Sequence, residues 1–330
     1  MKGPSFLQIL SFALSVREML QKGRYDIIHS FERTLYQDIY RAGDGCHREW
    51  LAQRRKIDPP GKDILHRINP LHRTLLWIEK QIFSEKGCRA VMTNSRRGKK
   101  EIIDLYGVPE EKISVIYTPV DSERFRCDRR EEERKKLRRQ FGLKRDTSLL
   151  LFVGSGFKRK GLTAVLKALP LLPFPVHLLV VGKDRPSPYR RLAGNLGVEK
   201  AVTFTGPLSD VAPCYQGADL FVFPTIYEPF SNVCIEAMAA GLPVITSRIN
   251  GASEVLLEGK NGYVIEDPLD PAEIAAKIRR GLDISGSAVA DANRDILDRL
   301  TWENHVDQVL ALYERVLNEK DPSGGGASNA

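Results

Sequence analysis

Two glutamates and a helix start form the stretch of the chain with the clearest chemical pattern. Glu228 follows a short apolar run, and Glu236 comes eight residues later, inside an expected helix. Ser231 or Asn232 can cap this helix, which leaves the backbone amides of Phe230, Ser231 and Asn232 as donors at its positive end. Carboxylates accept hydrogen bonds from sugar hydroxyls, and helix amides hold phosphate. The stretch suits a glycosyl diphosphate, although two acids at this spacing are by themselves more often solvated surface residues.

A glycine-rich basic turn is the second candidate binding element. Gly154 and Gly156 follow the apolar run at 148–153 and allow a close approach of the backbone, while Arg159 and Lys160 supply positive charge. An arginine can hold a phosphate through two N–H groups, and a lysine acts as a point charge. The turn lacks the Gly-Lys-Ser/Thr ending of a Walker A loop. A basic turn alone is more often a solvated loop, but together with the two glutamates of the same sheet it predicts a diphosphate site.

The flanking apolar segments predict the elements that position both groups. The run at 220–223 is short and rich in Phe and Val, which favours a buried parallel strand. Gly241, followed by Leu and Pro, ends the helix. From residue 147 onward similar strands alternate with helices, which indicates a doubly wound parallel sheet. Ligands bind such sheets at the carboxyl ends of the strands, where both groups lie.

Composition limits the class of protein. The 330 residues, 42% hydrophobic and 28% charged, fit a soluble globular protein of two domains. No run of eighteen apolar residues occurs. The apolar segment 5–16 is followed directly by Arg17 and Glu18, which favours an amphipathic helix over a signal peptide. The five scattered cysteines fit a reducing cytoplasm. Neither zinc-ligand spacing nor an Asp-x-Asp pair is present, so we expect no metal and no cofactor.

Charge is unevenly distributed along the chain. Residues 1–145 contain 32 Lys and Arg against 20 Asp and Glu, a balance of +12, whereas residues 146–330 contain 18 against 22, a balance of −4. The basic first half implies an anionic partner, either nucleic acid, a phosphorylated substrate or a membrane surface. Its segment 48–87 interleaves basic residues with Trp and Leu. This segment is either a helix packed on its own domain or a patch that meets anionic lipid head groups.

Two further candidates lie in the first half. His29 is near the end of an expected strand at 25–31, and Asp44 lies between two glycines. The end of a strand is where α/β sheets bind ligands, and glycines let the backbone come close to one. Taken alone, a single histidine is more often structural and an Asp-Gly segment more often a turn.

At these residues the sequence resembles the retaining glycosyltransferases of family 4, and within that family the bacterial lipopolysaccharide core glucosyltransferases. The signature is a glutamate, seven residues and a second glutamate, then an alanine and a Gly-x-Pro turn, here Glu228, Glu236, Ala237, Gly241 and Pro243. The resemblance implies an α/β protein of the GT-B fold, in which two Rossmann-like doubly wound domains face a cleft.

The resemblance also implies roles for individual residues. Arg159 and Lys160 would hold the donor diphosphate, Glu236 the ribose hydroxyls and Glu228 the sugar. Asp44 would face the donor sugar. The remaining implied contacts are the backbone of Leu208 at the base, the glycines and amides listed above at the diphosphate, and His29 on the acceptor side.

The predicted domains follow the same resemblance. An acceptor-side domain at 1–127 precedes a nucleotide-sugar donor domain at 128–300, a helix at 301–321 crosses back to the first domain, and 322–330 form a disordered tail. Family members begin with a strand and a Gly-rich turn before the helix that here begins at Ser5. We therefore expect a first domain truncated at its N-terminus, with an unpaired edge on the strand at 25–31.

The function expected from the sequence is transfer of a hexose, glucose above all, from a UDP-sugar to a lipopolysaccharide core or related glycolipid acceptor with retention. The protein would be peripheral on the inner, cytoplasmic face of the membrane and bound to its anionic surface. One alternative is a nucleotide-sugar-binding fragment without turnover. A basic nucleic-acid-binding protein is the other alternative, and the acidic balance of the second half argues against it, so no nucleic-acid partner is expected.

Overall fold

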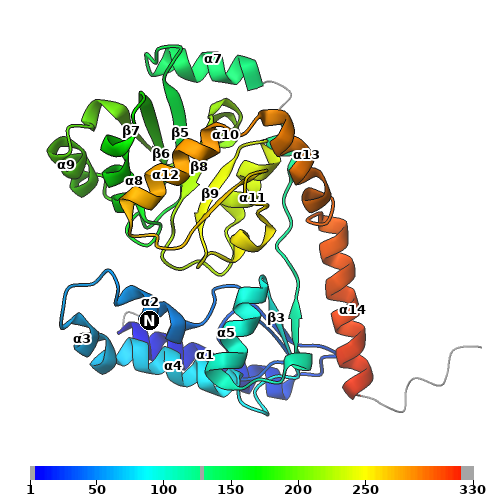
Figure 1. The fold of residues 1–330 in the computed structure, drawn as a ribbon. Coiled ribbons are helices and arrows are strands. Elements are labelled where there is room, and N and C mark those ends of the chain that lie inside the picture. Colours follow the sequence, from blue (N-terminus) through cyan, green and yellow to red (C-terminus); the bar gives the residue numbers. More distant parts are fainter. Residues whose placement is uncertain (1–3, 127–129, 321–330) are drawn as a thin grey trace, which may run out of the picture. The chain divides into compact units, whose positions relative to one another are not determined.

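A computed structural model describes residues 4–126 and 130–320 of the chain. The chain forms two compact units, which are described separately (Figure 1). The first contains the chain up to Tyr117 together with the C-terminal part from Glu303, and the second contains Thr118–Trp302. The predicted domain boundary at 127–128 and the predicted tail at 322–330 lie outside the described residues.

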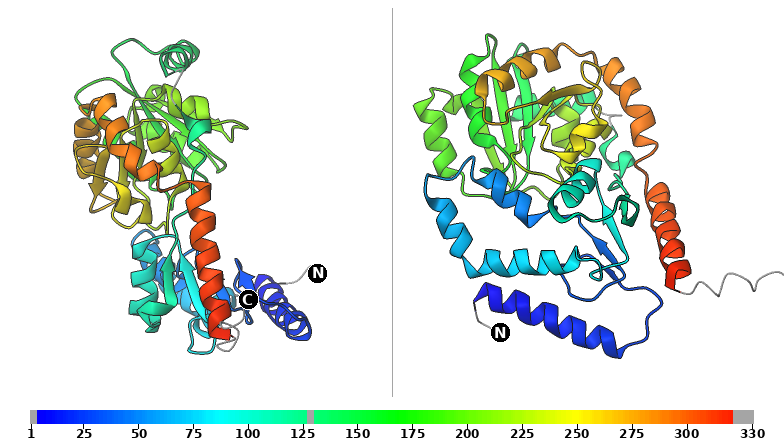
Figure 2. Two further views of the ribbon diagram at one scale, coloured as in Figure 1. Left: turned by 90° about the vertical axis from the view of Figure 1, so that its right-hand side faces the viewer. Right: turned by 60° about the horizontal axis from the view of Figure 1, so that its bottom comes forward.

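The first unit is built on a four-stranded parallel sheet with the strand order β1-β2-β3-β4. Tyr40 and Val91 point to one face, where they pack with α1, α4 and α5, and their neighbours Ile39 and Met92 point to the other, where α14 covers them (Figures 1 and 2). This alternation is the period of two expected for strands. The elements are α1 (Ser5–Lys22), β1 (His29–Ser30), β2 (Ile39–Arg41), α2 (His47–Arg54), α3 (Lys62–Ile68), α4 (Pro70–Ile82), β3 (Ala90–Thr93), α5 (Arg96–Tyr106), η1 (Glu110–Lys112), β4 (Ile113–Val115) and α14 (Trp302–Lys320).

Strand β1 is shorter than predicted. Residues 25–28 are not part of it, and within the described residues it pairs only with β2, so its outer edge is unpaired as expected. Ile28 is nevertheless joined to the start of β2, because its N–H donates to the Asp38 carboxylate at 2.9 Å and its carbonyl accepts from the Ile39 amide. Phe31, just after β1, is largely exposed.

The second unit contains the predicted doubly wound sheet, with six parallel strands in the order β10-β9-β8-β5-β6-β7. The chain runs outward from β5 in one direction and returns to β8 to run in the other, so β5 and β8 flank the point where the strand order reverses. Figure 1 shows helices on both sides of this sheet. The elements are α6 (Ser122–Phe125), α7 (Arg130–Gln140), β5 (Ser148–Val153), α8 (Leu162–Ala168), η2 (Leu169–Leu171), β6 (Val176–Val181), α9 (Ser187–Asn195), η3 (Glu199–Ala201), β7 (Val202–Gly206), α10 (Ala212–Gly217), β8 (Leu220–Phe223), α11 (Asn232–Ala239), β9 (Val244–Ser247), η4 (Gly251–Val255), β10 (Gly262–Ile265), α12 (Pro271–Leu282) and α13 (Gly286–Leu297).

Helix α7 has a packed face despite its many charges. It belongs to the second unit and packs on α10. Leu137 and Glu133 are buried in that contact. The approach is close because Gly217 of α10 has no side chain, since a Cβ there would lie 2.6 Å from Leu137 Cδ1. A charge-rich sequence hides a packed face when only one or two of its residues supply it.

A buried carboxylate joins the helices of the first unit. Glu79 of α4 is 1% exposed, and its carboxylate accepts from the His47 amide at 2.6 Å, from the Arg48 amide at 3.1 Å and from the Tyr106 hydroxyl. The two amides begin α2, so Glu79 satisfies donors that a helix start leaves unpaired. One side chain thereby connects the start of α2 and the end of α5 to α4.

Three histidines pack beside this contact. His47 Nε2 lies 3.1 Å from His72 Nδ1, and His66 hydrogen-bonds Asp58 Oδ2 at 2.8 Å. Burial is the main reason that the pKa of His47 falls from 6.5 to about 4, with the charge of Arg33 second, and burial also lowers the pKa of His72. The folded first unit therefore favours neutral imidazoles at His47 and His72.

The histidine pair predicts an acid-sensitive first unit. Because the folded pKa of His47 lies below its unfolded value, the unfolded chain binds more protons between pH 6.5 and about 4, and stability falls as pH falls through this window. We expect a loss of about 1–3 kcal/mol in the free energy of unfolding, and a smaller loss for His47→Asn. Thermal unfolding between pH 4 and 7 measures this. Equal slopes for the two proteins would contradict the assignment.

Candidate active site

The loop after β5 is fixed to the end of the neighbouring strand. The Phe157 amide donates to Asp184 Oδ2 at 2.7 Å, and the Lys183 amide donates to Ser155 Oγ at 3.2 Å. Asp184 follows β6, so its carboxylate holds the glycine-rich turn from the side. Sequence reasoning missed Asp184. The available signal was an acid two residues after the glycine that ends a buried strand.

The same loop is joined to the segment after β8. The Arg159 carbonyl accepts from the Ile226 amide at 2.9 Å and from Thr225 Oγ1 at 3.1 Å. Gly161 makes this junction possible, since its φ is +82° and a Cβ would lie 2.0 Å from the Pro224 carbonyl oxygen. The carboxyl ends of β5 and β8 are thus in direct backbone contact at the point where the strand order reverses.

The structure brings three of the predicted site residues together at this junction. Arg159 Nη1 donates to Glu228 Oε2 at 2.8 Å, and Lys160 Nζ forms an ion pair with the same oxygen. Arg159 also donates to the Tyr227 carbonyl at 3.1 Å. The side chains of Lys160 and Glu228 are 11% and 14% exposed, and that of Arg159 is 36% exposed. We call these three residues the ion cluster.

Burial governs the charge state of the ion cluster. Desolvation is the largest influence on Lys160 and lowers its pKa, while the neighbouring Glu228 carboxylate opposes this shift. The ammonium also lies 5.0 Å from the centroid of the Phe223 ring, a favourable cation–π distance.

A buried polar network sets the position of Glu228. Its amide donates to the Ile249 carbonyl at 3.3 Å, and its carbonyl accepts from the Gly251 amide at 3.0 Å. Between those two residues, Asn250 is completely buried and its amide group donates to Thr246 Oγ1 at 2.9 Å. The backbone of Glu228 therefore extends the sheet beside β9. Asn250 was not identified from the sequence. Its position shortly after a buried strand was the one available signal.

Glu236 lies on α11 and faces a different partner. Tyr215 donates to Glu236 Oε2 at 2.9 Å. Burial raises the pKa of Glu236, and the Tyr215 hydrogen bond and the charge of Arg124 oppose that shift. Its carboxylate thus points toward α10 and α6.

The residues at the start of α11 are placed partly as predicted. Ser231 occupies the position before the helix but makes no capping hydrogen bond through its side chain, because it is buried beside the Cys234 thiol. Phe230 is buried and Asn232 is exposed. Leu208, after β7, is partly exposed, and its role at the base stays a prediction.

In the first unit, Asp44 lies on a clamped loop. Asn94 donates to the Gly43 carbonyl at 3.1 Å, and Arg33 donates to the Gly45 carbonyl at 3.2 Å. Arg33 also lies 3.8 Å from the Asp44 carboxylate, which is 80% exposed. Asp44 is therefore an exposed acid on a loop held from both sides, and its role at the donor sugar stays a prediction.

His29 has a structural environment. Its Nδ1 lies 2.9 Å from the Tyr313 hydroxyl of α14, and its ring stacks on Phe31. Burial, assisted by the charge of Arg41, lowers the pKa of His29 to about 4, so the ring is neutral at physiological pH. These contacts favour the structural reading of this histidine.

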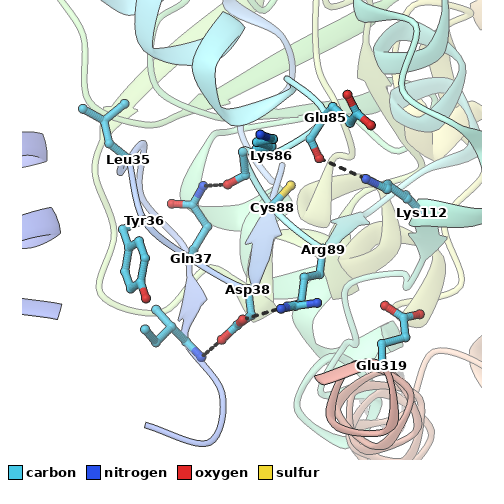
Figure 3. A pocket seen from close by; sticks show the side chains of 12 residues that line it. Leu35, Tyr36, Gln37, Asp38, Glu85, Lys86, Cys88, Arg89, Lys112 and Glu319 are labelled. Atoms are coloured by element: carbon cyan, nitrogen blue, oxygen red, sulfur yellow. Dashed lines mark hydrogen bonds and ion pairs between the residues drawn. The ribbon is translucent and has the colours of Figure 1, made fainter. Parts of the chain in front are cut away.

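A cavity of about 460 Å³ in the first unit is lined by residues other than those predicted from the sequence. Figure 3 shows Gln37 and Asp38, just before β2, facing Cys88 and Arg89, just before β3. Asp38 Oδ1 and Arg89 Nε are 3.4 Å apart. The cavity lies at the amino ends of the strands, whereas sheets of this type bind ligands at the carboxyl ends.

Comparisons with known proteins agree with this geometry. Residues 133–292 match the family described as glycosyl transferases group 1, and residues 1–124 match glycosyltransferase family 4. The chain belongs to the family 4 glycosyltransferases. Its two parallel sheets are the two Rossmann-like domains of the GT-B fold that this family uses.

Individual relatives give the degree of similarity. A glycosyltransferase of Methanocaldococcus jannaschii is 32% identical over 68% of this chain, and the aligned part spans 59% of that protein. The lipopolysaccharide glucosyltransferase WaaG of Escherichia coli is 29% identical over 81% of this chain and 71% of its own. A crystal structure of WaaG superposes with a TM-score of 0.76 and 25% identity, covering 98% of this chain and 85% of that one. HepE of Anabaena in complex with UDP has a TM-score of 0.71 and 20% identity over 95% and 84%.

The described residues contain neither a metal-binding cluster nor a membrane-spanning helix. Across 4–126 and 130–320, no group of three or more His, Cys, Asp or Glu side chains could hold a metal ion. In the same ranges, no helix combines the length and the apolar character that crossing a bilayer requires.

Two glycines of the basic loop provide a matched pair of substitutions. Gly156 and Gly161 have φ of +77° and +82°, but a Cβ at Gly156 meets no atom within 4 Å, whereas one at Gly161 overlaps the Pro224 carbonyl. Gly156→Ala should lower the free energy of unfolding by ~1–2 kcal/mol, which is the cost of placing an L-residue in the left-handed region. Gly161→Ala should cost clearly more and should also weaken UDP binding, because the junction must open. Thermal unfolding and calorimetric titration with UDP measure both effects, and equal losses would refute the close contact.

Proposed function

We propose that this protein transfers glucose from UDP-glucose, with retention, to a lipopolysaccharide core or a related glycan. The ion cluster carries the proposal, because two cations and a carboxylate meet at the carboxyl ends of β5 and β8, where sheets of this type bind ligands. The solved complexes of HepE with UDP and with UDP-glucose, which share the fold, support a nucleotide-sugar donor. The name of WaaG supports the acceptor.

The proposed roles follow from the charges. Arg159 and Lys160 hold the diphosphate and stabilise the negative charge that grows on it as the glycosidic bond breaks. One such preorganised donor is worth ~2.7–4 kcal/mol in the transition state. Glu228 accepts from sugar hydroxyls, and Glu236 accepts from the ribose. The amides at the start of α11 add donors for the diphosphate. No carboxylate is assigned as a nucleophile, and no metal is required by these roles.

A phosphorylated cyclitol is a second candidate acceptor. Several relatives are D-inositol 3-phosphate glycosyltransferases, and one of them, from Geodermatophilus obscurus, is 28% identical over 94% of this chain. The positive balance of residues 1–145 suits a phosphorylated acceptor as well as a lipid surface.

A panel assay tests the proposal. Hydrolysis and transfer are measured with a set of nucleotide sugars, using lipopolysaccharide core and inositol phosphate as acceptors. We expect UDP-glucose to give the fastest turnover and the core acceptor to accelerate it. Tight UDP-sugar binding without turnover would instead support the nucleotide-sugar-binding fragment.

The two glutamates should separate binding from turnover. Glu236→Ala should weaken UDP and UDP-glucose alike, since both contain the ribose. Glu228→Ala should lower kcat by about 10²–10³, the cost of one oriented polar group, with a much smaller effect on UDP affinity. Calorimetry and initial rates on the same preparations provide the comparison. A Glu236→Ala protein with unaltered UDP affinity would exclude the ribose role.

The exposed side of α3 and α4 supports a peripheral membrane protein of the cytoplasmic face. Ile68 of α3 and Trp77 of α4 are 62% and 45% exposed, and α4 places its other apolar face in the core through Ile78 and Ile82. The exposed apolar and basic residues of this surface are Ile64, Leu65, Arg67, Ile68, Arg73, Trp77 and Lys80. A surface that combines exposed apolar residues with cations suits an anionic lipid surface.

Vesicle binding tests this surface. Replacement of Arg67, Arg73 and Lys80 by Ala should weaken binding to anionic vesicles, by about 1 kcal/mol per cation near the membrane. Replacement of Lys22, Lys86 and Lys100, three exposed lysines elsewhere in the first unit, removes the same charge and should have a small effect. Co-sedimentation at rising salt gives the measurement. Equal binding to neutral and anionic vesicles would rule out the electrostatic docking.

A further inference from the structure

The ion cluster concentrates two positive charges on a single oxygen. Arg159 Nη1 lies 2.8 Å from Glu228 Oε2, and the Lys160 ammonium pairs with that same atom. The Lys160 and Glu228 side chains are almost completely buried. The arrangement satisfies both cations within the protein.

A buried ammonium requires a counter-ion. Removing a charge from water costs several kcal/mol unless an opposite charge and hydrogen bonds replace the water. Glu228 supplies both for Lys160, and its carboxylate counteracts the effect of burial on the pKa of that lysine. Glu228 is therefore the internal anion of this site, in addition to any contact it makes with a sugar.

The proposed function assigns the same two cations to the donor diphosphate. A diphosphate and a carboxylate cannot both be held by Arg159 and Lys160 through the same N–H groups, and the two anions repel each other. The Glu228 backbone is fixed by the Ile249 carbonyl and the Gly251 amide, so any exchange of partners involves its side chain alone.

We propose that the Glu228 carboxylate occupies the diphosphate position in the absence of donor and is displaced when the diphosphate binds. This inference rests on the proposed function. The displaced carboxylate, anchored by its backbone, becomes an acceptor for the sugar hydroxyls next to the diphosphate. Recognition of the diphosphate is thereby coupled to positioning of the sugar, and UDP without a sugar bears the cost of displacement with no compensating contact.

The coupling predicts opposite effects on two ligands. In Glu228→Gln the neutral amide competes weakly for the cations, so UDP should bind more tightly than to the unaltered protein, by about fivefold or more, the low end of coupling between two ligands of one protein. UDP-glucose should gain less or should lose affinity, because the charged acceptor for its hydroxyls is gone.

The experiment is a calorimetric titration of UDP and UDP-glucose into the full chain and its variants. Glu258→Gln is the matched control, because it also removes a carboxylate that pairs with a lysine of the second unit, here Lys277 at 3.2 Å. Glu258 lies just before β10 and therefore at the amino ends of the strands. Its UDP affinity should equal that of the unaltered protein. In a Lys160→Met background, the gain from Glu228→Gln should shrink, because one of the two contested cations is absent.

Each outcome decides the inference. UDP affinity that is unchanged or weaker in a folded Glu228→Gln protein, as judged by thermal unfolding, overturns the displacement and leaves the proposed function standing. If neither protein binds UDP, the proposed function fails and the inference with it. If Glu228→Gln does not fold, Glu228→Asp is used, whose shorter side chain withdraws the carboxylate from the cations. Tighter UDP binding by that variant supports the displacement, and unaltered binding overturns it.

Discussion

The contact of Glu228 with Arg159 and Lys160 is the constraint around which the second unit is organised. Burying these three charges is costly unless their geometry is fixed, since an unpaired buried ion destabilises a protein by several kcal/mol. The sheet fixes it from both sides. Backbone hydrogen bonds join the turn after β5 to the segment after β8, Asp184 holds that turn, and Asn250 holds the segment beside β9. Much of the polar network of this unit thus serves one ion cluster.

The first unit uses a buried carboxylate for a different purpose. Glu79 accepts from the two amides that begin α2, so it contributes to the fold and holds the end of the loop that carries Asp44. Two donors, Asn94 and Arg33, grip the carbonyls on either side of Asp44. Glu79 is 1% exposed, whereas the side chain of Asp44 is 80% exposed. Both carboxylates nevertheless belong to one local structure. The buried one gives the loop rigidity, and the exposed one remains available to a partner.

The two units differ in how they present charge. The second gathers its functional cations at one edge of its sheet, where the internal carboxylate balances them. The first carries several of its cations beside exposed apolar side chains of α3 and α4. The arrangement in the second unit suits a small anion held by fixed donors, and the arrangement in the first unit suits a broad anionic surface.

The sequence by itself determined the family, the doubly wound second sheet and the residues of the ion cluster. Short apolar runs identify buried strands, and polar residues directly after such runs must lie at the carboxyl edge. Tertiary structure decided which of those residues touch. Glu236 lies within the same motif as Glu228, but its position on α11 turns it toward Tyr215. Asp184, Arg33 and Glu79 carry no motif, because their roles depend on backbone groups far away in the chain. Helix α7 and His29 show the same limit, since local charge and strand position cannot reveal the neighbour against which a side chain packs.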